Sequence, residues 1–259
     1  MYKFQTTEYK LNTACFGREL RFALVSDLHS SERTQIDGIL SEIRRQSPDY
    51  ILMAGDILER LDGSAPQAKR AGFELMRELC AIAPVLYSIG NHENGGTGSW
   101  NILKWKLTDG IPKSYDEREM SQISELGVNI LDDDMIMLDG IAFCGLTSGI
   151  INKGQMPNLE VVKRLCELEC PKVLLCHHPE YYSKYLSDSN IDLVVSGHAH
   201  GGQWRIFGRG VFAPNQGIFP KYTSGVHDGR HIISRGLVPS RGIVPRIFNR
   251  PELVFIIAN

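Results

Sequence analysis

Short apolar runs alternate with amphipathic stretches over the first third of the chain. Residues 21–26, 50–54 and 85–89 are apolar runs with the length of a buried β-strand. Between them, residues 34–46 and 68–80 place apolar side chains at the spacing that lines one face of a helix. This order predicts a βαβαβ unit with parallel strands and right-handed crossovers.

The regular rhythm ends after residue 93. A glycine-rich loop occupies residues 94–99, and helical spacing returns at residues 100–107 and again at residues 117–126. Three short strands are then predicted at residues 128–131, 135–138 and 141–146. Because tight polar turns join these strands, we expect them to pair antiparallel.

The last part of the chain predicts a second sheet. Residues 159–169 have a helical pattern, and residues 172–176 and 193–196 are buried-strand runs. From residue 201 onward glycine is frequent and the strands are short, ending with residues 253–257. We therefore expect a second, more antiparallel sheet that packs on the first.

The chain has the length of one large α/β domain. It has 259 residues, with no internal repeat and no low-complexity linker. We predict a single domain over residues 1–259, with a cap or insert at residues 94–120. Trp100 and Trp105 follow the glycine-rich loop in this insert. They could line the organic part of a substrate or simply pack against the sheet.

Composition and charge narrow the classes of function. The hydrophobic fraction is 42% and the charged fraction is 22%, both ordinary for a globular protein. A formal net charge of −2 argues against a general electrostatic grip on nucleic acid. The N-terminus has no signal-peptide core, and no apolar run is long enough to span a bilayer. We expect a soluble, cytoplasmic protein without an integral membrane segment.

Most of the eight histidines lie in short polar motifs that directly follow predicted strands. Strand ends at one edge of an α/β sheet converge, so the side chains of these motifs can share one site. The motifs, in chain order, are Asp27-Leu28-His29, Gly55-Asp56, Gly90-Asn91-His92-Glu93, His177-His178-Pro179 and Gly197-His198-Ala199-His200.

The residue types in these motifs are metal ligands. Carboxylate oxygen and neutral imidazole nitrogen suit manganese, iron and zinc ions. In an extended strand, side chains two residues apart lie on the same side, so Asp27 and His29 could bind one ion, as could His198 and His200. A carboxylate that follows a glycine, as at Asp56, could bridge two ions. The pattern is typical of a two-metal hydrolase.

These motifs, in this order, resemble the calcineurin-like metallophosphoesterases over residues 22–200. The last motif, at residues 197–203, is similar to the Gly-His-Thr-His-Gly-Gly-Gln motif of one bacterial branch, with Ala199 in place of threonine. The resemblance implies an α/β fold, a four-layer α/β/β/α sandwich of two mixed sheets flanked by helices.

The resemblance also implies two metal ions, with manganese, iron or zinc expected. A hydroxide that bridges the ions would attack phosphorus, and His92 would be catalytic, either protonating the leaving oxygen or stabilising the transition state. Glu93 would orient His92, while His178 matches no ligand position. The implied ligands are Asp27, His29, Asp56 and His200 for one ion and Asp56, Asn91, His177 and His198 for the other, with Asp56 shared.

Several functions are compatible with these residues. We favour hydrolysis of a phosphodiester over a phosphomonoester, in a small phosphorylated molecule such as a lipid-type head group. A protein Ser/Thr phosphatase is an alternative, although residues 55–60 lack the Gly-Asp-x-x-Asp-Arg-Gly form. A catalytically silent metal-binding scaffold is another. Arg60, Arg235, Arg241 and Arg246 are candidates for phosphate binding or are ordinary surface residues.

Overall fold

The computed structural model describes residues 3–29, 33–59, 61, 66–94, 115–148, 156–214, 216–241 and 244–259. Most of the predicted insert, residues 95–114 with Trp100 and Trp105, lies outside these ranges, and so does Arg60. The insert and its role as a cap therefore stay predictions.

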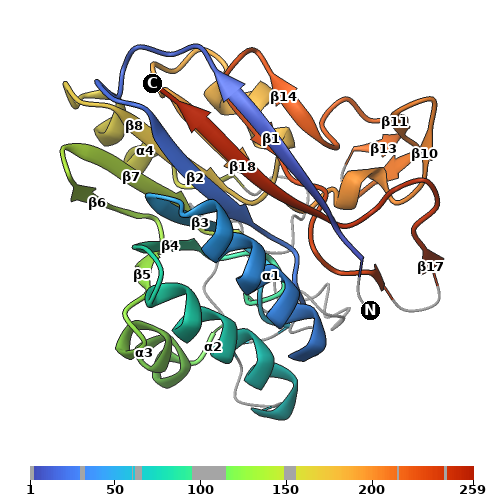
Figure 1. Ribbon diagram of the computed structural model, residues 1–259. Helices are drawn as coiled ribbons and strands as arrows, with labels where there is room; N and C mark the ends of the chain where they lie inside the picture. Colours follow the sequence, from blue (N-terminus) through green and yellow to red (C-terminus); the bar gives the residue numbers. More distant parts are fainter. Residues whose placement is uncertain are drawn as a thin grey trace, which may run out of the picture.

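Two six-stranded mixed sheets form the centre of the molecule (Figure 1). The first has the order β1-β18-β2-β3-β4-β5, in which only the β18–β2 pair is antiparallel. Its strands are β1 (Gln5–Leu11), β2 (Leu20–Val25), β3 (Tyr50–Ala54), β4 (Val85–Ser88), β5 (Asn129–Leu131) and β18 (Glu252–Ala258).

The second sheet has the order β14-β15-β9-β8-β7-β6. Its four inner strands run parallel and its two edge pairs are antiparallel, so it contains more antiparallel pairing than the first sheet, as expected. Its strands are β6 (Asp134–Leu138), β7 (Ile141–Leu146), β8 (Lys172–Cys176), β9 (Leu193–Ser196), β14 (Gly225–His227) and β15 (His231–Ile233).

Helices cover the outer face of each sheet, which confirms the four-layer α/β/β/α sandwich. Helices α1 (Arg33–Gln46), α2 (Pro66–Cys80) and α3 (Glu117–Glu125) pack on the first sheet, and α4 (Leu159–Cys166) with the π-helical turn η2 (Tyr182–Leu186) on the second. No helix among the described residues is long and apolar enough to cross a membrane.

The core between the sheets is apolar and contains stacked aromatic rings. Tyr50 of β3 lies 5.8 Å from Phe22 of β2 and 5.0 Å from Phe143 of β7, measured between ring centroids. The Phe143 ring thus bridges the two sheets. Fully buried aromatic side chains of this size contribute a large part of the apolar burial that stabilises such a core.

A group of small hairpins follows the last strand-end motif. They lie together at one end of the molecule, at the right of Figure 1. The elements are the short 3₁₀ turn η3 (His200–Gly202), β10 (Arg205–Ile206), β11 (Arg209–Gly210), β12 (Phe212–Ala213), β13 (Gly217–Ile218), β16 (Ser240–Arg241) and β17 (Val244–Pro245).

Two parts of the sequence prediction differ from the structure. The strand β1 was not predicted, because its alternating polar residues form an edge strand whose partner, β18, lies at the other end of the chain. The strand β5 does not pair with β6 but runs parallel to β4 in the first sheet. The turn between β5 and β6 thus connects the two sheets, which a local hairpin pattern cannot reveal.

Candidate metal centre

The polar motifs meet at one edge of the sandwich, as expected. Each follows β2, β3, β4, β8 or β9, and within each sheet these strands are parallel, so their carboxyl ends lie together. The seven predicted ligands and His92 are all buried, with at most 9% of any residue exposed. Their nitrogen and oxygen atoms form overlapping clusters with metal-binding spacing.

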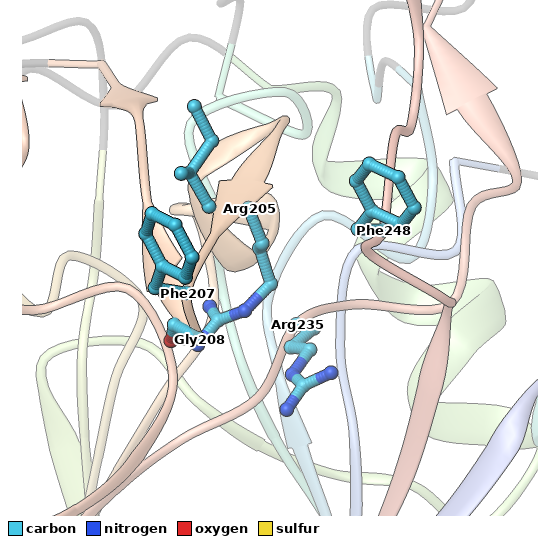
Figure 2. Close-up of a pocket in the computed structure, with 6 residues that line it drawn as sticks. Arg205, Phe207, Gly208, Arg235 and Phe248 are labelled. Atoms are coloured by element: carbon cyan, nitrogen blue, oxygen red, sulfur yellow. Dashed lines mark hydrogen bonds between the residues drawn. The ribbon is translucent and has the colours of Figure 1, made fainter.

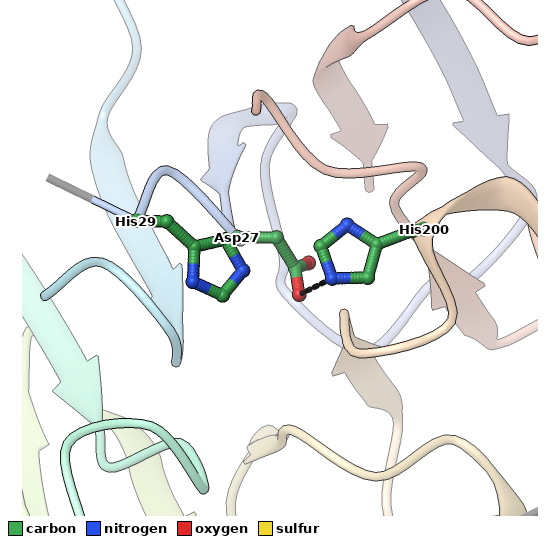
Figure 3. Close-up of side chains that lie close together, drawn as sticks. All are labelled: Asp27, His29 and His200. Carbon is green, nitrogen blue, oxygen red and sulfur yellow. Dashed lines mark ion pairs between the residues drawn. The ribbon is translucent and has the colours of Figure 1, made fainter. Parts of the chain in front are cut away.

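The first cluster joins Asp27, His29 and His200 (Figure 3). The Oδ1 atom of Asp27 lies 3.5 Å from Nε2 of His200, and the rings of His29 and His200 are nearly parallel, 5.3 Å apart. The potential ligand atoms of the three residues all lie within 4.8 Å of one another.

The second cluster joins Asp56, His177 and His198. The Nε2 atom of His177 is 3.1 Å from Oδ2 of Asp56 and 3.1 Å from Oδ1 of Asn91. The same Asp56 oxygen is 4.0 Å from Nε2 of His29, so Asp56 lies between the two clusters. This is the position from which one carboxylate can serve two cations.

The buried groups of the second cluster shift one another's pKa values. Burial alone would lower the pKa of His177, but the Asp56 carboxylate raises it to about 10. Burial alone would raise the pKa of Asp56, but His177 and other histidines hold it well below its usual range. Burial and the neighbouring histidines lower the pKa of His198 well below its usual value. The pocket therefore favours a positive charge beside Asp56 and a neutral His198.

The donor set fits metal ions. The Nε2 atom of His29 is buried and makes no hydrogen bond among the described residues, although it faces Asp56. A buried nitrogen without a hydrogen bond is costly, and a bound cation would use it. Oxygen and imidazole ligands in this ratio suit borderline divalent ions.

Backbone geometry, and not strand alternation, brings the paired ligands together. The strands end before the motifs, and five ligands have a left-handed backbone with φ between 45° and 64°. The expectation that strand alternation places the two ligands of Asp-x-His and of His-x-His on the same side is therefore wrong. Such φ values are uncommon outside glycine and cost roughly 1–3 kcal/mol each. The five residues are Asp27, His29, Asp56, His198 and His200.

Two glycines let the motif loops approach closely. Gly55 has φ of 80°, and a Cβ atom there would lie 2.7 Å from both Gly90 Cα and His177 Nδ1. A Cβ atom on Gly90 would collide with Asp56. Any side chain at either position would push the second cluster apart.

Glu93 does not orient His92, contrary to expectation. Its fully buried carboxylate accepts hydrogen bonds from the backbone N–H groups of Asp56, Ile57, Leu58 and Gly90 and from the Tyr87 hydroxyl. Burial, with the Asp56 charge, raises the pKa of Glu93 to about 7. Glu93 therefore connects the loops that carry Asp56 and Asn91.

Glu59 has the role that was expected of Glu93. Its carboxylate lies 3.1 Å from Nδ1 of His92 and 3.2 Å from Nδ1 of His29. Burial opposes the charge, but the two histidines lower the pKa of Glu59. The sequence did indicate that Glu59 could reach the site, because Glu59 occupies the position of the second aspartate in the Gly-Asp-x-x-Asp-Arg-Gly form.

The other candidates have different surroundings. A guanidinium nitrogen of Arg246 lies 3.4 Å from Nδ1 of His200, so this arginine reaches the site. Arg235 lies 3.7 Å from the Glu252 carboxylate, and the side chain of Arg241 is outside the described residues. His178 packs against His198 and lies 3.4 Å from Glu180, and these three residues form a further small cluster beside the site.

Known proteins with similar sequences are described as metallophosphoesterases. An uncharacterized metallophosphoesterase of Helicobacter pylori is 27% identical over 191 residues, which cover 72% of this chain and 46% of the relative. The metallophosphoesterase YkuE of Bacillus subtilis is 26% identical over 266 residues, covering 97% of this chain and 84% of that one. The chain thus spans about half the length of the first relative and most of the second.

Among solved structures, a dimetal phosphatase from Danio rerio aligns with a TM-score of 0.49 and 13% identity, covering 84% of this chain and 87% of that chain. The model of the calcineurin-like phosphoesterases matches residues 20–202, which include all seven candidate ligands and His92. On that match, this chain belongs to the calcineurin-like phosphoesterase family.

Proposed function

We propose that this chain is a phosphoesterase that depends on two metal ions, with manganese, iron or zinc as candidates. The observation that carries the proposal is the pair of buried clusters that meet at Asp56. The residues that would hold the ions are Asp27, His29, Asp56, Asn91, His177, His198 and His200. When bound, the ions would supply positive charge to the phosphoryl oxygens and lower the pKa of a water molecule.

His92 is the proposed acid for the leaving oxygen. Its backbone N–H donates to Oδ1 of Asp56, which holds the residue against the site. Its Nδ1 lies 3.1 Å from the Glu59 carboxylate, and a protonated His92 would give its Nε2 proton to the leaving oxygen. Glu59 keeps the ring in this orientation.

The proposed substrate is a small phosphodiester, with a lipid-type head group as one class. Arg246 supports this, because its guanidinium beside His200 could contact a phosphate oxygen that projects from the site. A protein Ser/Thr phosphatase is the second candidate, favoured by the Glu59–His92 pair at the position of that family's second aspartate.

The test measures hydrolysis of bis-p-nitrophenyl phosphate and p-nitrophenyl phosphate, with Mn²⁺ added and then chelated. We expect turnover of the diester to exceed that of the monoester and to stop on chelation. Asp56→Ala should lose both bound metal, measured by elemental analysis, and activity. The exposed Asp188→Ala is the matched control and should keep both.

Four results would contradict the proposal. Full activity after chelation would exclude metal dependence, and an active Asp56→Ala protein would exclude the proposed site. Metal binding without hydrolysis of either ester would favour the silent scaffold. Preference for a phosphoserine peptide over the diester would favour the protein phosphatase.

A further inference from the structure

Large apolar side chains are concentrated on the surface of the small hairpins. Of the eleven exposed large hydrophobic residues in the described part of the chain, eight lie in residues 204–219 and 247–248. Single exposed apolar residues are ordinary, but a contiguous set marks a binding surface. We call this set the hairpin face; its members are Trp204, Ile206, Phe207, Phe212, Ile218, Phe219, Ile247 and Phe248.

Three phenylalanines of the hairpin face project from turns. Phe207 is fully exposed, and Phe248 and Phe219 are 87% and 61% exposed. All three have a left-handed backbone, with φ of 48°, 52° and 50° respectively. Glycine, asparagine or aspartate fits such turns better and is better hydrated than phenylalanine. Neither local conformation nor packing within the fold therefore accounts for these aromatic rings.

The hairpins hold these rings on one connected framework. Phe207 and Phe248 lie on opposite sides of an open groove of about 480 Å³, with Arg205 and Arg235 between them (Figure 2). Phe219 is tied to the same framework, because its N–H donates to the Val211 carbonyl, and the N–H of Val211 donates to the carbonyls of Gly202 and Trp204.

The hairpin face is basic as well as apolar. Residues 201–227 and 233–251 contain seven arginines and lysines and no aspartate or glutamate. The whole chain has 28 basic and 30 acidic residues, so this separation of charge is local. Arg209, Lys221 and Arg250 are exposed beside the aromatic residues. The occupant of the face must therefore accept aromatic rings and supply negative charge.

We propose that the hairpin face docks onto an anionic lipid bilayer. The phenylalanines at the turns enter the boundary between head groups and acyl chains, while the arginines and lysine stay at the level of the lipid phosphates. Separate projecting turns suit a deformable bilayer.

Docking would place the candidate metal centre beside the lipid head groups. Asn249, next to Phe248, donates hydrogen bonds to the carbonyls of His200 and Gln203, so the face continues directly from the last strand-end motif. The inference does not depend on the proposed function, because it concerns where the protein binds and not which bond it cleaves.

Vesicle sedimentation with the full chain tests the inference. We expect binding to vesicles of phosphatidylcholine with phosphatidylglycerol, weak binding to phosphatidylcholine alone, and release at high salt. The double variant Phe207→Ser/Phe248→Ser should weaken binding about tenfold or more. The triple variant Arg209→Glu/Lys221→Glu/Arg250→Glu should weaken it by at least about fivefold per residue changed.

Matched controls lie on other surfaces. Met137→Ser removes an apolar side chain that is 52% exposed, and Arg118→Glu reverses a charge that is 90% exposed. Both controls should bind vesicles like the parent chain, and all variants should keep its melting temperature and its hydrolysis of a soluble diester.

The inference is overturned if the parent chain does not bind anionic vesicles, or if the control variants lose binding as strongly as the hairpin variants. It is also overturned if sedimentation velocity without lipid shows a dimer that Phe207→Ser/Phe248→Ser disrupts while vesicle binding is absent. That result would assign the hairpin face to a second copy of the chain.

Discussion

The metal centre and the hairpin face lie next to each other, and both depart from the usual rule that apolar side chains are buried and charged ones exposed. At the metal centre, carboxylates and histidines are buried together. On the hairpin face, phenylalanines are exposed. Of the thirteen non-glycine residues with positive φ in the described part of the chain, five belong to the first region and three to the second. In both regions the left-handed backbone is strained and the side chains lie in surroundings that do not suit them. Neither feature stabilises the folded chain.

The difference between the two regions lies in how each is supported. The polar side chains of the metal centre are held by many partners, including the Glu93 carboxylate and the approach of Gly55 to Gly90. The phenylalanine rings of the hairpin face are exposed, so their side chains are not held in place by packing. Substitutions should therefore affect catalysis and stability at the first region and only binding at the second.

The largest expected effect is on catalysis, at His92. His92→Ala should lower kcat about 100- to 1000-fold and leave the metal content unchanged, because the residue is outside the ligand set and provides proton transfer. Glu59→Gln should cause a smaller loss by weakening the orientation of the ring. Steady-state kinetics with elemental analysis measures both effects, with His227→Ala as the control. Loss of metal in His92→Ala would assign this histidine to the ligands instead.

A large effect on stability is expected at Glu93. Glu93→Ala leaves four buried backbone N–H groups and the Tyr87 hydroxyl without their acceptor. It should lower the free energy of unfolding by about 3 kcal/mol or more, measured by urea denaturation. The partly exposed Glu59→Ala should change it by less than about 1 kcal/mol. Equal losses would mean that Glu93 is not a structural connection.

His231 is a buried histidine with no carboxylate partner in the described part of the chain. It is fully buried, lies 2.9 Å from the Ser196 hydroxyl, and burial lowers its pKa well below 6.5. The unfolded chain therefore takes up the proton first as the pH falls. Above pH 6.5 the neutral ring does not lower the free energy of unfolding. Below pH 6.5 this free energy falls by about 1.4 kcal/mol per pH unit, because the unfolded chain binds the proton and the folded chain does not.

His231→Gln should remove this part of the acid destabilisation, because glutamine does not titrate in this range. Urea denaturation at a series of pH values between neutral and mildly acid conditions measures the slope for both proteins. An unchanged slope in the variant would mean that His231 is protonated in the folded chain.

The smallest expected effect is on the stability of the hairpin face. Phe207→Ser/Phe248→Ser should change the free energy of unfolding by no more than about 0.5 kcal/mol, because exposed side chains bury little area. Phe143→Ala, in the core between the sheets, should cost about 3–5 kcal/mol. A large destabilisation by the hairpin variant would mean that its rings pack within the fold.

Most of the fold was predictable because its signals are local. The runs at β3, β7, β8 and β9 were predicted with the observed bounds, since buried strands have continuous apolar sequences. The edge strand β1 was not predicted, because its polar alternation acquires meaning only beside β18. The pairing of β5 was wrong for the same reason: the choice of partner depends on the whole sheet.

The identity of the candidate ligands could be read from the chain, because the chemistry of aspartate, asparagine and histidine belongs to each residue and the apolar runs place them at strand ends. The exchange of roles between Glu59 and Glu93 could not. Both glutamates are near the site in sequence, and only the folded loops show that one faces His92 while the other faces backbone N–H groups. The hairpin face likewise depends on how distant segments meet, because exposure is a property of the packed molecule and not of a residue type.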